Sequence, residues 1–204
     1  MHLNVRMIAK SHILNHKSKI SPMRKVVFDV ETKNTFQEVG SGDPAALDIS
    51  LLVVYDYHSN KYLTYKEEDF KDLWKLLENT DLIIGYNSDH FDLPLLNKYY
   101  PGDLKAIKSL DLLAEIKKSY GKRMSLDAVA AGTLGTSKIG HGLQAVTWWK
   151  EGKIDKIQKY CEEDVKITKQ VYEYALKNGL LKYKEINKVY EFPIDTSKLS
   201  IGNS

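Results

Sequence analysis

Residues 26–31 read Val26-Val27-Phe28-Asp29-Val30-Glu31, an apolar run that carries two acidic residues near its end. The run predicts a buried strand over residues 25–30. Side chains alternate across a strand, so Asp29 and Glu31 share one face. The sequence therefore predicts two neighbouring carboxylates on an otherwise apolar strand.

Two further stretches carry acidic residues in a comparable setting. Residues 82–92 read Leu82-Ile83-Ile84-Gly85-Tyr86-Asn87-Ser88-Asp89-His90-Phe91-Asp92, and residues 160–164 read Tyr160-Cys161-Glu162-Glu163-Asp164. In the latter, Tyr160 and Asp164 are four residues apart and share a helix face. Oxygen ligands that converge on one point repel each other, so such a cluster is expected only where a cation compensates it. This is the outline of a two-metal site that cleaves phosphodiesters.

The three stretches resemble the motifs of the DEDD superfamily of 3′–5′ exonucleases, which has the ribonuclease H-like fold. The first resembles the family's Asp-x-Glu, the second its Asn-x-x-x-Phe-Asp, and the third its Tyr-x-x-x-Asp, the motif of the tyrosine branch (DEDDy). The histidine branch places His one residue earlier, where this chain has Lys159. The following Leu93-Pro94-Leu95-Leu96 extends the likeness to proofreading domains of family B DNA polymerases.

The resemblance implies a role for each of five residues and two bound ions, Mg²⁺ or Mn²⁺. Asp29 would bridge both ions, and Glu31 and Asp164 would complete the ion that activates water. Asp92 would hold the second ion. Tyr160 would orient the attacking water, because a phenol with a pKa near 10 is a poor base at neutral pH.

Three residues are candidates for substrate binding. The backbone N–H of Thr32 could approach the 3′-terminal nucleotide. Asn87 could orient Asp92 or contact a sugar or phosphate, or it could stabilise its loop through an Asx turn. Phe91 could stack on a terminal base or pack in the core.

Other polar residues near the motifs have plainer interpretations. Asp89 competes with Asp92 for the second motif, but the spacing from Asn87 favours Asp92 and predicts that Asp89 faces solvent or substrate. Asp111 resembles an auxiliary acid, and a helix cap is the favoured interpretation. The basic loop at residues 137–142 is interpreted as a surface turn that could also reach substrate phosphates.

The pattern along the chain predicts an α/β fold, a ribonuclease H-like mixed β-sheet with helices on both faces. We expect a basic, disordered extension over residues 1–22, an exonuclease domain over 23–180, and a hairpin and tail over 181–204. Strands are expected at 25–30, 49–55, 61–65 and 81–86. Helices are expected at 67–79, 91–99, 125–134, 143–150 and 154–177, with a helix or a strand then a helix in 104–119 and a loop over 32–47.

Composition and charge set limits on location and partners. With 204 residues, 43% of them hydrophobic, the chain suits one domain with a proper core. No apolar run approaches the ~20 residues of a membrane span. A single cysteine excludes an internal disulfide and predicts a reducing, cytoplasmic setting.

The net charge of +3 comes from the first 22 residues, which hold four basic and no acidic residues, so the remainder has a net charge of −1. Such a domain should bind nucleic acid weakly without metal ions, and the basic segment at residues 1–22 could strengthen binding by contacting the nucleic acid. A mitochondrial transit peptide is the alternative interpretation of that segment.

These observations predict a 3′–5′ exonuclease that releases nucleoside 5′-monophosphates from the 3′ end of single-stranded DNA or RNA. A separate polymerase or helicase could be its partner. A partner-dependent nucleic-acid-binding module and a ribonuclease H-type endonuclease are the alternatives.

Overall fold

The computed structural model describes residues 23–136 and 142–199, so the predictions for residues 1–22 and for the loop at 137–141 lie outside the described residues. Short 3-10 turns lie at Pro44–Ala46, Glu67–Asp69 and Leu104–Ala106. The strands and helices are β1 (Lys25–Thr32), α1 (Phe36–Val39), β2 (Ile49–Asp56), β3 (Lys61–Tyr65), α2 (Phe70–Glu78), β4 (Leu82–Gly85), α3 (Asp92–Asn97), β5 (Lys108–Asp111), α4 (Leu112–Tyr120), α5 (Leu126–Thr133), α6 (Gly142–Lys150), α7 (Ile154–Asn178), β6 (Leu180–Glu185), β7 (Lys188–Pro193) and α8 (Thr196–Leu199).

A mixed five-stranded sheet in the order β3-β2-β1-β4-β5 forms the centre of the molecule. The first three strands are antiparallel neighbours, and β4 and β5 run parallel to β1. The helix α2 makes the crossover from β3 to β4, as expected for a parallel connection. The strand that carries the first motif therefore lies in the middle of the sheet, hydrogen-bonded on both edges.

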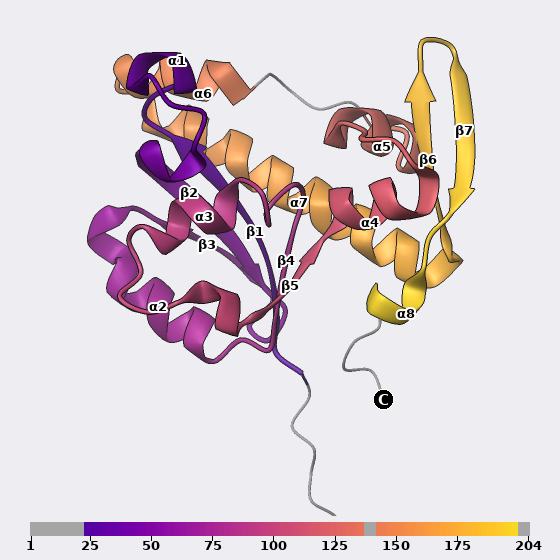
Figure 1. The fold of residues 1–204 in the computed structure, drawn as a ribbon, viewed down its shortest axis with the longest axis horizontal. Coiled ribbons are helices and arrows are strands. Elements are labelled where there is room, and N and C mark those ends of the chain that lie inside the picture. Colours follow the sequence, from indigo (N-terminus) through magenta and orange to yellow (C-terminus); the bar gives the residue numbers. More distant parts are fainter. Residues whose placement is uncertain (1–22, 137–141, 200–204) are drawn as a thin grey trace, which may run out of the picture.

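Helices cover both faces of this sheet (Figure 1). Side-chain alternation sends Val26, Phe28 and Val30 of β1 toward a core shared with α2 and α3. It sends Val27 to the opposite core, which is shared with α4, α5, α6 and α7. This second face is the one on which Asp29 and Glu31 lie, so the predicted α/β fold with helices on both faces is confirmed.

The segment between β1 and β2 is not the featureless loop that was predicted over residues 32–47. Thr35 and Glu38 form a capping box: the Thr35 hydroxyl accepts from the Glu38 N–H at 3.3 Å, and the Glu38 carboxylate accepts from the Thr35 N–H at 2.8 Å. The four-residue helix α1 follows, and Gly40 ends it in the left-handed conformation at φ 66°. The prediction was wrong here because the sequence carries a Thr-x-x-Glu capping signal at Thr35 and Glu38, which begins a short helix.

Residues 104–119 contain a strand followed by a helix, the second of the two predicted arrangements. Asp111 caps that helix, as predicted, by accepting from the N–H groups of Leu113 and Ala114. Pro94 lies in the first turn of α3, where its missing N–H costs no helical hydrogen bond.

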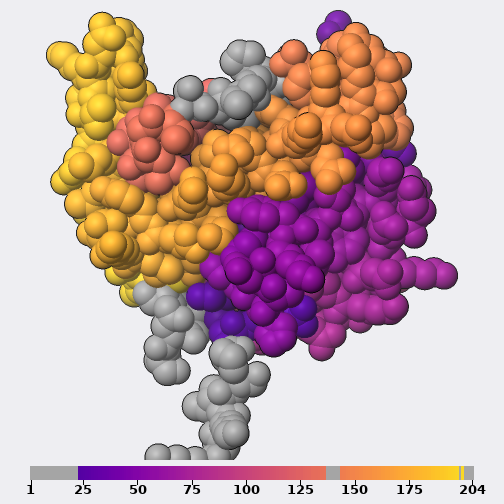
Figure 2. Space-filling model, turned by 180° about the vertical axis from the view of Figure 1, so that it is seen from behind, coloured from indigo at the N-terminus to yellow at the C-terminus, as the bar shows by residue number. Residues whose placement is uncertain are grey.

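The hairpin β6–β7 packs against α5 and α7 and contributes Leu181, Tyr183 and Phe192 to the core that those helices share. Figure 2, a view from behind, shows α7 in orange across the body and the hairpin in yellow rising beside it. Gly132 of α5 permits this contact: a Cβ there would lie 2.4–2.6 Å from backbone atoms of Tyr183. Among the described residues, no helix has the length and apolar character needed to cross a bilayer.

Candidate active site

One cavity of about 490 Å³ collects the predicted site residues from three segments that are far apart in sequence. It opens where the carboxyl ends of the parallel strands β1 and β4 meet the start of α3 and one face of α7. All eight residues expected to act in catalysis or substrate binding line it: Asp29, Glu31, Thr32, Asn87, Phe91, Asp92, Tyr160 and Asp164.

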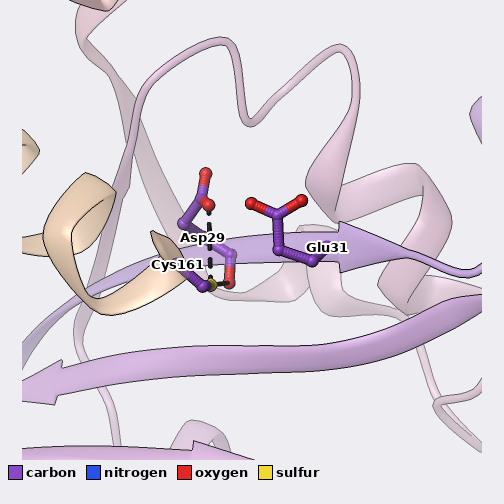
Figure 3. Close-up of side chains that lie close together, drawn as sticks. All are labelled: Asp29, Glu31 and Cys161. Atoms are coloured by element: carbon purple, nitrogen blue, oxygen red, sulfur yellow. Dashed lines mark hydrogen bonds between the residues drawn. The ribbon is translucent and has the colours of Figure 1, made fainter. Parts of the chain in front are cut away.

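Asp29 and Glu31 project from the same face of β1, and Figure 3 shows their carboxylates directed to the same side of the strand. Asp29 is partly buried and Glu31 is buried, with an exposed fraction of 7%. The pairing of β1 with β2 shifts register between Glu31 and Thr32. Such bulges commonly redirect side chains beside active sites, and this one lies where the strand enters the cavity.

The helix α7 presents Tyr160 and Asp164 one turn apart on its buried face. Both side chains are about 95% buried, and both line the cavity. The Tyr160 ring meets the indole of Trp148 edge to face, with ring centroids 6.0 Å apart. Tyr160 is therefore both a packed aromatic and a cavity residue.

Asp92 is buried at the first residue of α3, where its carboxylate accepts the backbone N–H of Val30 at 3.1 Å. This hydrogen bond ties the second motif to the first across the sheet edge. Burial raises the pKa of Asp92 to about 7; the negative charges of Asp111 and Asp164 add to the shift and the Val30 N–H opposes it. The main cause is the loss of solvation on burial, and the neighbouring acidic groups add to it.

Asn87 occupies the left-handed region at φ 64°, a conformation that asparagine tolerates better than most residues. Its backbone N–H donates to the Asp111 carboxylate at 2.8 Å, and its side-chain oxygen accepts from Arg123 at 2.7 Å. Among the described residues, the Asn87 side chain thus hydrogen-bonds to Arg123, a partner 36 residues away.

Asp89 lies outside the cavity, and this agrees with the prediction that it faces solvent or substrate. It is exposed, and its carboxylate accepts a hydrogen bond from the Ser109 hydroxyl. Together with Leu93, it lines a separate groove along β5. The loop of the second motif therefore directs Asp92 inward and Asp89 outward.

Two aromatic rings form part of the cavity wall. Phe91 packs against the α2–α3 core on one side and meets Phe36 of α1 edge to face at 6.0 Å on the other. Phe36 is 39% exposed, and Leu143 across the mouth is 73% exposed. Thr32 lines the cavity while its hydroxyl donates to the carbonyl of Asn34 at 2.9 Å.

Cys161 joins the acidic centre from beneath β1. Its thiol donates to the backbone oxygen of Asp29 at 3.3 Å and lies 3.6 Å from one of its carboxylate oxygens, as the dashed lines in Figure 3 show. Burial raises the pKa of the thiol well above its usual value, and the charges of Asp29, Glu31 and Asp164 add to the effect. The thiol therefore stays protonated, and its contacts help to hold Asp29 in place.

The donor set of the cavity fits divalent cations. Four carboxylates line it, while no Lys, Arg or His is among the described residues that do so. Asp29, Glu31 and Cys161 each offer a ligand atom, and these atoms lie within 4.8 Å of one another. Hard oxygen ligands in this number suit Mg²⁺ or Mn²⁺, which would supply the positive charge that the protein lacks here.

Three contributors to this region were not predicted from the sequence: Phe36, Arg123 and Cys161. Phe36 could have been found through the capping box of α1, which fixes it at the first helical position. Arg123 and Cys161 reach their partners only through the tertiary fold, at separations of 36 and 132 residues.

Comparison with known proteins places this geometry in a family. The fold is similar to that of the family B DNA polymerase from the hyperthermophilic archaeon Pyrobaculum calidifontis, with a TM-score of 0.57 and 21% sequence identity over 76% of this chain. The match spans only 25% of the polymerase chain. No curated protein sequence matches significantly. The model of the RNase_H superfamily matches residues 26–176, three quarters of the chain, and the protein belongs to that superfamily.

Proposed function

We propose that the protein is a metal-dependent 3′–5′ exonuclease of the tyrosine branch of the DEDD superfamily. It removes nucleoside 5′-monophosphates from the ends of single-stranded nucleic acid. The observation that carries this proposal is the convergence of Asp29, Glu31, Asp92, Tyr160 and Asp164, from three separate segments, on one cavity. Membership of the RNase_H superfamily supports it.

Asp29, Glu31, Asp92 and Asp164 would hold two divalent ions, Mg²⁺ or Mn²⁺. Such ions lower the pKa of bound water and neutralise the charge that develops on a phosphodiester during hydrolysis. The protein contributes a rigid frame for them, because Asp29 and Glu31 lie on the central strand and Asp92 is tied to that strand through Val30.

The Tyr160 hydroxyl holds and orients the attacking water in this proposal. Its ring is immobilised by burial and by Trp148. A phenol hydroxyl can both donate and accept a hydrogen bond, so it can hold a water molecule in one orientation.

The cavity walls match the parts of a terminal nucleotide. Phe91 and Phe36 offer faces on which a base can stack. Thr32 and Asn87 offer hydrogen-bonding groups for its sugar or phosphate. A cavity of about 490 Å³ has the size of a small-ligand pocket, so a paired end would have to open before a nucleotide could enter.

Incubation of 5′-labelled single-stranded DNA and RNA with the purified protein tests the proposal. We expect a ladder shortened from the 3′ end, with nucleoside monophosphates as products, in Mg²⁺ or Mn²⁺ and no products in EDTA. Internal fragments would instead indicate a ribonuclease H-type endonuclease. Binding without cleavage under all metal conditions would favour a nucleic-acid-binding module that acts with a polymerase or helicase.

The substitution Tyr160→Phe tests the assignment to the tyrosine branch. We expect kcat to fall about ten- to a thousandfold, a loss of ~1.4 to 4 kcal/mol of transition-state stabilisation, because only the water-orienting hydroxyl is removed. The melting temperature should hardly change, since the ring and its packing remain. A variant with the parental kcat at saturating Mg²⁺, under conditions where chemistry limits the rate, would exclude a role for this hydroxyl.

A further inference from the structure

The cavity has an acidic interior, yet its proposed substrate is an anion. The described residues that line it include four carboxylates and no cationic side chain. Bound metal ions can balance the phosphate that is cleaved, but they lie at the carboxylates. A second phosphate, on the strand that leads into the cavity, needs a donor at the rim.

Arg123 contacts the cavity residue Asn87 and is held beside the cavity by the residue that follows it, Met124. It lies in the turn between α4 and α5, where Met124 is 8% exposed and packed in the core. The Met124 carbonyl accepts the Tyr86 hydroxyl at 2.8 Å, and Tyr86 directly precedes Asn87 and also lines the cavity. The turn is therefore fastened to the loop of the second motif, and the Arg123 side chain is exposed beside it.

The contact between Arg123 and Asn87 fixes which way the Asn87 amide points. A guanidinium can only donate hydrogen bonds, so the Asn87 atom 2.7 Å from Arg123 must be the carbonyl oxygen. The amide NH₂ is then directed away from Arg123. The backbone of Asn87 is also held, through its N–H to Asp111. Asn87 lines the cavity, so its two remaining donors are available to an oxygen of a bound strand.

We propose that Arg123 and Asn87 together form a phosphate-binding site for the nucleotide on the 5′ side of the scissile bond. Arg123 orients the Asn87 amide and donates some of its four remaining N–H groups to the non-bridging oxygens of that phosphodiester. Guanidinium groups bind such oxygens through paired, charge-assisted hydrogen bonds. This inference rests on the proposed function for the direction of the strand, while the ligand chemistry, a phosphodiester anion, follows from the donors.

Two oligothymidylate probes separate this site from general charge attraction. Both carry fluorescein at the 5′ end, and one has a neutral methylphosphonate at the linkage before the terminal one. Anisotropy in Ca²⁺, which takes the same oxygen ligands as Mg²⁺, should show that the wild-type protein binds the all-phosphate probe about tenfold more tightly. Arg123→Ala should bind both probes with the weaker affinity.

Three further variants define the geometry. Arg123→Lys should recover only part of the discrimination, since an ammonium keeps the charge and lacks the fork. Asn87→Ala added to Arg123→Ala should cost little more, because the two residues act as one unit. Lys117→Ala, which removes an exposed charge from the last turn of α4 and does not line the cavity, is the matched control and should keep the tenfold ratio.

The possible outcomes are distinguishable. An Arg123→Ala protein that folds normally and still prefers the all-phosphate probe tenfold overturns the site. A wild-type protein that discriminates between the probes but never cleaves in Mg²⁺ contradicts the proposed exonuclease activity and supports the phosphate site. A wild-type protein that binds neither probe overturns both.

Discussion

At the scale of single residues, Asp92 is where burial and charge conflict most directly. Asp92 is 4% exposed, and its carboxyl is close enough to Asp111 and Asp164 to be influenced by both. The backbone N–H groups of Val30 and of Asp92 itself stabilise its charged form. A carboxylate in this position destabilises the metal-free fold and becomes favourable when a cation arrives. In the proposed function, the free energy that burial of this charge costs the folded state would be recovered when a metal ion binds.

This conflict predicts how the metal-free protein responds to pH. The pKa of Asp92 is 3.8 in a model chain and about 7 in the folded protein, so the folded state holds the proton more tightly. Protonation of Asp92 therefore stabilises the folded state. This contribution is complete below pH 4 and is lost as pH rises to 7, which lowers the free energy of unfolding by up to about 4 kcal/mol. Thermal unfolding in EDTA should show a falling melting temperature over this range and a clearly smaller fall for Asp92→Asn.

The same residue offers a sharp test of the second motif. Asp92→Asn should lower the cleavage rate at least a hundredfold, since an amide is a poor ligand for hard cations, whereas Asp89→Asn should retain most activity. Both substitutions remove one negative charge from the same loop, and only Asp92 lines the cavity. If both variants lose the same fraction of the cleavage rate in steady-state assays, Asp92 is not the acid of the second motif that acts in the cavity.

At the scale of elements, β5, α4 and the loop of the second motif meet at one buried carboxylate. Asp111 ends β5, caps α4 through Leu113 and Ala114, and accepts the N–H groups of Asn87 and Asp89. Burial raises the pKa of the Asp111 carboxyl, and the hydrogen bonds from the N–H groups of Asn87, Ala114 and Asp89 oppose this shift. The position of the loop of the second motif is thus set by the start of a helix that carries none of the proposed metal ligands.

Removing this carboxylate should affect stability and activity together. Asp111→Ala leaves four N–H groups without their acceptor, and we expect the free energy of unfolding to fall by about 2 to 4 kcal/mol. Asp103→Ala is the matched control: it removes an exposed cap from the 3-10 turn at Leu104–Ala106 and should cost about 1 kcal/mol. Urea titration of both variants measures the difference; similar losses would mean that Asp111 acts only as a helix cap.

At the scale of the whole molecule, the hairpin β6–β7 shares its core with the helices that support the site. The contact of α5 with β6 is so close at Gly132 that no side chain fits. Thr133 strengthens it: its hydroxyl donates to the Lys182 carbonyl at 2.7 Å and accepts the Lys182 N–H at 3.0 Å. The chain that follows α7 thereby stabilises the helical layer behind the cavity.

Gly132→Ala should therefore destabilise the protein by about 3 kcal/mol, the upper end of the usual range for overpacking, because the obstructing atoms are backbone and cannot rotate away. Gly42→Ala, where a Cβ meets nothing within 4 Å, should leave the free energy of unfolding nearly unchanged. Chemical denaturation compares the two. A stable Gly132→Ala protein would mean that α5 and β6 can separate at little cost.

Local patterns were sufficient to predict the main strands and the long helices, and the resemblance to the DEDD motifs predicted the set of residues that line the cavity. Alternation placed Asp29 beside Glu31, and helical spacing placed Tyr160 beside Asp164, because both relations follow from backbone geometry. The contact of Arg123 with Asn87 could not be predicted in this way, since it depends on how one turn docks against another. The same holds for Cys161 beneath Asp29, which requires α7 to lie across β1.

The absence of cationic side chains from the described lining of the cavity also determines how occupants influence one another. Carboxylates alone repel a phosphodiester, so the affinity for nucleic acid must rise with the concentration of free divalent ion. Thermodynamic reciprocity then requires the strand to tighten metal binding by the same factor. The two occupants behave as mutual effectors, and a dissociation constant for either one has meaning only when the concentration of the other is stated.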